Sequence, residues 1–103
     1  MRESDILNQV IRYLHYRPGK YWRQNTGAFK VQEQGRKSRF IRFNVPGAAD
    51  ITGIREGQRI EIEVKRPGGK LTDKQKAFGE MIKSEGGKYL VVYGVEDLQK
   101  EGI

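Results

Sequence analysis

The feature that most constrains the fold is a near-continuous apolar run late in the chain, from Lys88 to Val95. A short apolar run without polar alternation is typical of a strand buried on both faces of a sheet. It directly follows a segment with helical spacing that starts at Thr72 and ends at Gly86-Gly87. A helix followed by a strand that returns to the sheet is a crossover. We therefore expect an α/β chain with one mixed sheet and helices packed against it.

The segments before this crossover predict one helix and several short antiparallel strands. Apolar residues at helical spacing indicate an amphipathic helix that begins near Ile6 and ends before Pro18. Alternation and turn residues indicate strands over 21–24, 28–33, 39–45, 50–55 and 59–65. The last two form a hairpin, and residues 96–101 add a helical turn. With 103 residues and neither repeats nor a linker, the chain is predicted to be a single domain over residues 1–103.

Composition excludes several classes of protein. Cysteine is absent, which excludes disulfides, thiol nucleophiles and thiolate zinc sites. No apolar run approaches the roughly 20 residues of a membrane span, and the acidic start from Met1 to Asp5 is unlike a signal peptide. We therefore expect a soluble, intracellular protein with no membrane partner.

Positive charge is concentrated in one part of the chain. The formal net charge is +7, and residues 11–45 alone hold nine basic residues and one acid. Aromatic residues lie among these cations, a combination that favours nucleic acid as the partner over a merely solvated basic face. Trp22, within this segment, is either a core residue or a platform on which a base stacks. The candidate DNA-binding residues are Arg12, Arg17, Lys20, Arg23, Asn25, Lys30, Arg36, Lys37, Arg39, Arg42 and Arg66.

The strand expected over 59–65 carries the polar residues best suited to catalysis. Its apolar residues face one way, while Glu61, Glu63 and Lys65 face the other, toward a cleft or solvent. Glu63 and Lys65 are about 6.6 Å apart along the strand, too far for a simple contact but suited to flank a metal or a water. Across the hairpin, Asp50 is expected near the level of Glu63 to Lys65. Two carboxylates and one ammonium group are thus expected to converge.

This combination suits phosphodiester hydrolysis. Carboxylates hold Mg²⁺ or Mn²⁺, and the ion polarises the phosphoryl oxygen and lowers the pKa of a water. A lysine can orient that water and stabilise charge that develops on the phosphate. The structural alternatives are that Asp50 is a turn residue after Pro46-Gly47, and that Glu63 and Lys65 form a solvated strand face.

Several segments, in order along nearly the whole chain, resemble one nuclease family. They are Val45 to Ile51, Ile62 to Lys70, Leu71 to Phe78, the upstream segment Tyr21 to Gly27, and the opening Glu3 to Ile6. Together they resemble the VRR-NUC domain, the virus-type replication-repair nuclease branch of the PD-(D/E)XK superfamily, in its small stand-alone phage-encoded form. The resemblance implies a restriction-endonuclease-like fold, with a single mixed sheet flanked by helices in the order α-β-β-β-β-α-β.

The resemblance also implies roles for individual residues. Asp50 and Glu63 would be metal ligands, with the Val64 carbonyl as a further ligand, and Lys65 would be the catalytic lysine.

Two more residues match family positions and have structural alternatives. Gln75 matches a catalytic-site glutamine on the adjacent helix, but it also completes a capping box with Thr72. Glu3 matches a metal-ligating acid of the first helix, but it also suits a helix start. Leu7 departs from the family pattern, which usually has a glutamine there.

The implied function is a Mg²⁺- or Mn²⁺-dependent endonuclease for structured or branched DNA, four-way junctions among them, in replication or repair. The family implies cleavage to a 5′-phosphate and a 3′-hydroxyl, by a homodimer in the cytoplasm of a bacterial host. The alternative is a non-catalytic nucleic-acid-binding module; a structural protein of a ribonucleoprotein particle is a third, weaker one. Both need only the basic segment, whereas the nuclease requires Asp50, Glu63 and Lys65 together.

Overall fold

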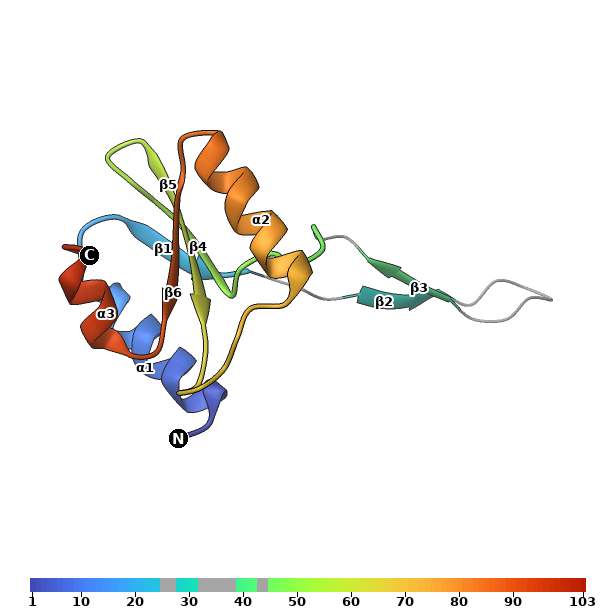
Figure 1. Cartoon of the computed structure of the whole chain (residues 1–103), viewed down its shortest axis with the longest axis horizontal. Coiled ribbons are helices and arrows are strands. Elements are labelled where there is room, and N and C mark those ends of the chain that lie inside the picture. The colour runs from blue at the N-terminus through green and yellow to red at the C-terminus, as the bar shows by residue number, and fades with distance from the viewer. Residues whose placement is uncertain (25–27, 32–38, 43–44) are drawn as a thin grey trace.

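The structure, a computed structural model, describes residues 1–24, 28–31, 39–42 and 45–103, with side chains described for 1–24 and 45–103. The elements follow one another as shown in Figure 1. They are α1 (Glu3–His15), β1 (Lys20–Arg23), β2 (Ala28–Val31), β3 (Arg39–Arg42), β4 (Ile51–Arg55), β5 (Gln58–Val64), α2 (Asp73–Ser84), β6 (Lys88–Val92) and α3 (Val95–Lys100).

The centre of the fold is a four-stranded mixed sheet with the order β1-β4-β5-β6. β4 pairs antiparallel with β1 and β5, whereas β6 lies parallel to β5 after the crossover through α2. The α/β class and the mixed sheet with flanking helices, predicted from the apolar run, are confirmed. β2 and β3 pair with each other as a two-stranded ribbon that extends away from this sheet (Figure 1).

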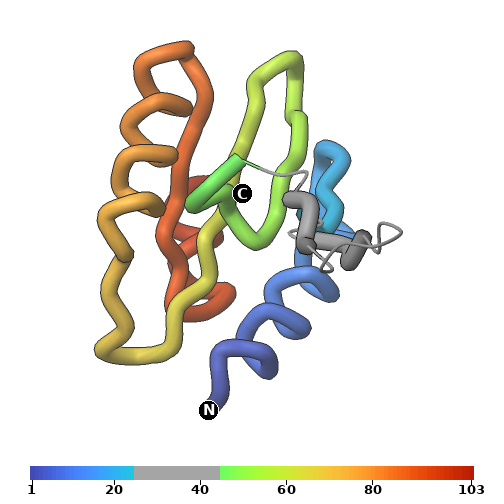
Figure 2. Tube along the Cα trace, turned by 90° about the vertical axis from the view of Figure 1, so that its right-hand side faces the viewer, coloured from blue at the N-terminus to red at the C-terminus, as the bar shows by residue number. Residues whose placement is uncertain are grey.

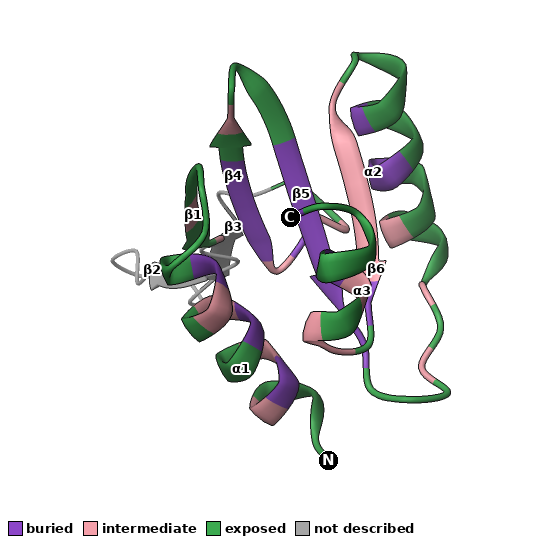
Figure 3. Ribbon diagram, turned by 90° about the vertical axis from the view of Figure 1, so that its left-hand side faces the viewer, coloured by how far each residue is buried: buried purple, intermediate pink, exposed green. Residues whose placement is uncertain are grey.

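Helices cover both faces of the sheet. Figure 2 shows α2 on one side of the sheet and α1 on the other. The alternation of β5 directs Ile60, Ile62 and Val64 into the larger core with α1 and α3, where the buried surface is concentrated (Figure 3). The opposite face packs against α2 through Phe78 and Ile82. Within the described ranges, no helix combines the length and apolar character of a membrane span.

Gly47 fixes the approach of α2 to the start of β4. Its φ is +76°, and a Cβ at this position would overlap the backbone of Lys74 and Gln75 in the first turn of α2. The loop before β4 therefore touches α2 backbone to backbone. This contact sets the spacing between Asp50 and Gln75.

We expect Gly47→Ala to lower the free energy of unfolding by roughly 2–4 kcal/mol, because overpacking adds to the strain of a left-handed conformation. Gly57→Ala is the matched control, since Gly57 has a φ of +80° but open space around it. It should lose only about 1 kcal/mol. Denaturant unfolding measures both, and equal losses would contradict the close contact with α2.

Candidate active site

The register of the β4–β5 hairpin brings Asp50 to Glu63. Ile51 lies opposite Ile62, so Asp50, one residue before β4, falls opposite Glu63. The backbone N–H of Val64 donates to Asp50 Oδ2 over 2.8 Å, which holds this carboxylate at the end of the hairpin. Asp50 was expected near the level of Glu63 to Lys65, and it lies at the Glu63 end of that range.

Glu3 completes a cluster of three carboxylates. One oxygen each from Glu3, Asp50 and Glu63 lies within 4.8 Å of the others. Glu3 also stands in the first turn of α1, so its position suits both the helix start and the site. Glu63 is 2% exposed, and its Oε1 is buried without a hydrogen-bond partner. A buried oxygen left unpaired is costly, and an all-carboxylate set fits a hard divalent cation such as Mg²⁺ or Mn²⁺.

The electrostatics of this cluster favour a bound cation or proton. Burial, followed by the charge and hydrogen bond of Asp50, raises the pKa of Glu63 from 4.5 to about 8, against the opposing effect of Lys65. Glu63 therefore keeps a proton near neutral pH when no cation is present. A divalent ion would favour the ionised carboxylates instead.

Lys65 lies in contact with Glu63. The prediction that these two residues are too far apart for a simple contact is therefore wrong. Nζ of Lys65 is 3.8 Å from Glu63 Oε2, because the long side chains close the spacing that the backbone leaves. The solvated-face alternative is also wrong. Glu61 is 0% and Lys65 8% exposed, since α2 covers this part of the sheet.

The side-chain amide of Gln75 takes part both in the cap of α2 and in a hydrogen bond to Glu63. Its backbone N–H donates to Thr72 Oγ1 over 3.2 Å, and its Oε1 accepts from the Thr72 N–H over 2.9 Å, which is a complete capping box. Its Nε2 donates to Glu63 Oε2 over 3.2 Å. Both alternatives for Gln75 are thus present in the geometry. The helix cap fixes the amide that orients Glu63.

Gln24 lies in the segment Tyr21 to Gly27 that carried the family resemblance, but the sequence interpretation gave it no role. Its Nε2 donates to the Ala49 carbonyl over 3.0 Å, and its backbone N–H donates to the Asp50 carbonyl over 2.9 Å. Gln24 therefore anchors the backbone of Asp50 from β1. Only the β1–β4 pairing reveals this contact, and local sequence carries no signal for it.

Glu61 and Tyr89 are two further polar residues on neighbouring strands of the sheet. Tyr89 on β6 lies opposite Glu61, and the Glu61 Oε2 and the Tyr89 hydroxyl are both buried without a partner. Arg59 approaches the other oxygen of Glu61 at 3.4 Å. Burial and the charge of Glu63 raise the pKa of Tyr89 to about 12. The sequence did indicate that Glu61 shares a strand face with Glu63, but the sequence interpretation assigned Glu61 no role in the site.

The basic candidates fall into three groups. Arg12, Lys20, Arg23 and Arg66 are exposed, so contact with DNA stays a prediction for them. Arg17 donates to the Ile103 carbonyl over 2.7 Å and lies over the Tyr13 ring, which gives it a structural role. Asn25, Arg36 and Lys37 lie outside the described residues, and Lys30, Arg39 and Arg42 belong to β2 and β3, whose backbone alone is described.

The sequence of this chain matches one known domain family. A model of the VRR-NUC domain matches residues 1–96 of the 103-residue chain, a range that includes the carboxylate cluster, Lys65 and Gln75. No curated protein matches the chain.

The raised pKa of Glu63 predicts how stability depends on pH. Between 4.5 and about 8 the folded chain keeps a proton on Glu63 that the unfolded chain has lost, so stability falls as pH rises through this range. In EDTA, we expect the melting temperature to fall accordingly and Mn²⁺ to restore it at the upper end. Glu63→Gln should remove most of the fall, and Glu56→Gln, in an exposed turn, should not. The same slope in both variants would contradict the assignment.

Two substitutions separate the helix cap from the contact with Glu63. Thr72→Ala removes the cap and should cost about 1 kcal/mol of stability while Gln75 still reaches Glu63. Gln75→Glu preserves a capping box but places a further carboxylate beside Glu63. We expect Gln75→Glu to keep most of its stability in thermal melts at acidic pH and to lose DNA cleavage. If only Thr72→Ala lost cleavage, the Gln75 amide would have no part in the site.

Proposed function

The chain belongs to the VRR-NUC domain family, and we propose that it is a metal-dependent endodeoxyribonuclease that acts on structured or branched DNA in replication or repair. The observation that carries the proposal is the convergence of three carboxylates on one site, with Lys65 beside them. A merely DNA-binding module has no use for three mutually repelling carboxylates, one of which, Glu63, is buried. The net charge of +7 supports a polyanionic substrate.

The residues of the cluster suit Mg²⁺ or Mn²⁺. Glu3, Asp50 and Glu63 offer carboxylate oxygens, and the Val64 carbonyl is a further candidate ligand. When bound, such an ion supplies a Lewis acid that polarises the phosphoryl oxygen and lowers the pKa of a water.

Around this ion, the chain's own side chains orient the reacting groups. Lys65 places an ammonium group where negative charge grows on the phosphate and where a water can be oriented. Gln75 holds the Glu63 carboxylate in one orientation through Nε2. Attack of water on phosphorus with departure of the 3′-oxygen leaves a 5′-phosphate and a 3′-hydroxyl. To cut both strands of a duplex, two copies would act as a two-fold pair.

Lys65→Ala tests the catalytic assignment. We expect the wild type to nick supercoiled plasmid and cut a four-way junction with Mg²⁺ or Mn²⁺ and to be inactive in EDTA. Loss of the Lys65 charge should lower the rate by about 10²–10³-fold. Lys100→Ala, which removes an exposed lysine of α3, should leave the rate unchanged.

Gel shifts in EDTA complete this experiment. Lys65→Ala should bind DNA as tightly as the wild type, because its proposed role is in the reaction. Equal cutting by the two proteins would contradict the role of Lys65. Binding by a wild type that cuts no substrate with either ion would indicate the non-catalytic module.

A further inference from the structure

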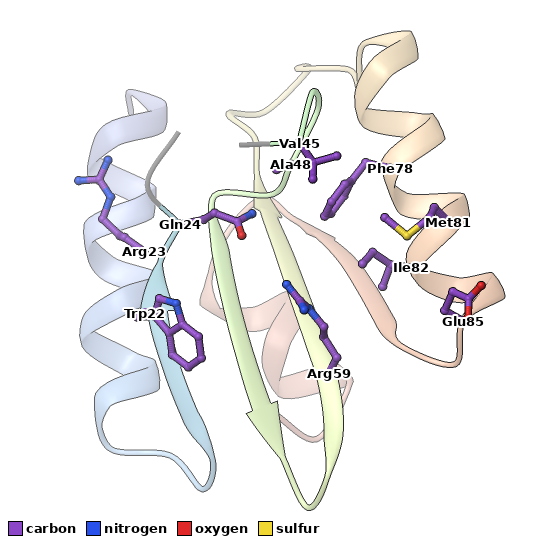
Figure 4. A pocket seen from close by; sticks show the side chains of 10 residues that line it. All are labelled: Trp22, Arg23, Gln24, Val45, Ala48, Arg59, Phe78, Met81, Ile82 and Glu85. Atoms are coloured by element: carbon purple, nitrogen blue, oxygen red, sulfur yellow. The ribbon is translucent and has the colours of Figure 1, made fainter. Parts of the chain in front are cut away.

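A groove of about 620 Å³ lies on the α2 side of the sheet, next to the carboxylate cluster. Its walls are β1 and α2, as Figure 4 shows. Trp22 and Gln24 project from the β1 side, Phe78, Met81 and Ile82 project from α2, and Arg59 rises between them from β5. The groove is thus largely apolar, with Arg59 at its floor and Arg23 and Glu85 also in its lining.

Trp22 is the most unusual member of this lining. It is 55% exposed, so the core alternative for this residue is wrong. Met81, on the opposite wall, is 43% exposed. Two large apolar side chains that face each other across an open groove are typical of a surface that binds a ligand. The chain has a single tryptophan, so Trp22 also reports on the groove spectroscopically.

One end of the groove lies beside the backbone that carries Asp50. Gln24 and Ala48 line this end. Gln24 bonds to the carbonyls of Ala49 and Asp50, so this end lies one residue from a proposed metal ligand. A nucleotide attached to a phosphate at the cluster would therefore reach the groove.

We propose that this groove binds an unpaired nucleobase of the DNA strand that is cut, with the base stacked on Trp22. The inference rests on the proposed nuclease function and deepens it, because it makes an unpaired base beside the cut a feature of the substrate. A paired base inside a duplex offers no free face for stacking, whereas an unpaired base does.

Charge favours DNA over a second copy of the chain as the occupant. Arg59 is exposed at the floor, with one nitrogen 3.4 Å from Glu61, so it can also meet a phosphate. The chain carries a net charge of +7, which favours a polyanion as the occupant of a groove with this arginine at its floor.

The test uses the fluorescence of Trp22 in EDTA, where cleavage cannot occur. Three DNA duplexes of the same sequence are compared: one with a single unpaired adenine, one with an abasic residue at that position, and one fully paired. We expect the unpaired adenine to quench Trp22 and to bind about 5- to 100-fold more tightly than the abasic duplex, as expected for one stacked base. Equal quenching and affinity for the adenine and abasic duplexes would overturn the proposal.

Substitutions of Trp22 test whether the preference for the unpaired adenine arises in the groove. Because Trp22→Ala and Trp22→Phe both lack the single tryptophan, their affinities are measured by gel shift in EDTA. Trp22→Ala should lose the preference for the unpaired adenine, and Trp22→Phe should keep part of it because a phenyl ring still stacks. Ile54→Ala is the matched control, since Ile54 is an exposed apolar residue on the same sheet face but outside the groove lining. If Trp22→Ala kept the full preference, the base would bind elsewhere.

Two further outcomes separate this inference from other accounts. Trp22 fluorescence that depends on protein concentration without DNA, with a sedimentation change in Trp22→Ala, would assign the groove to a second copy and overturn the proposal. Cleavage is measured separately with Mn²⁺. Loss of base preference with intact cleavage overturns only the groove, whereas base preference without cleavage overturns only the nuclease.

Discussion

The antiparallel pairing of β4 with β5 is the constraint on which the rest of the structure depends. With Ile51 opposite Ile62, these two residues enter the core with α1, and Asp50 meets Glu63 at the end of the hairpin. Side chains alternate along a strand, so a slip of one residue would bury the acids in the apolar core and expose the isoleucines. The large free energy of burying that core therefore also fixes the register of the acids. Fold and site are specified by the same alternation.

The site concentrates charge that the fold on its own does not need. Glu63 is buried between the Asp50 carboxylate and the covering helix α2, and its pKa is raised in consequence. Lys65 and the Gln75 amide offset part of this cost, and Glu63 Oε1 still lacks a partner. Such a destabilised cluster is expected where function requires it. A divalent cation among the carboxylates would supply the missing compensation.

The sequence alone predicted those features of the fold and site that follow from local patterns of apolar and polar residues. The alternation of residues 59–65 placed Glu63 and Lys65 on one face, and the apolar run from Lys88 placed the parallel strand and the crossover. It did not predict that α2 would cover that face, because helix orientation follows from long-range contacts such as Gly47 against α2. The tie from Gln24 to Asp50 and the contact of Arg17 with Ile103 join residues distant in sequence, for which no spacing rule exists.

The most direct test of the account is the position of a bound ion. A crystal grown with Mn²⁺ and measured near the manganese absorption edge gives an anomalous difference map that locates the ion without assumptions about activity. The account predicts a peak coordinated by oxygens of Asp50 and Glu63, with Glu3 at the same ion or bridged to it by water. A map with manganese bound elsewhere, and no peak at these carboxylates, would contradict it.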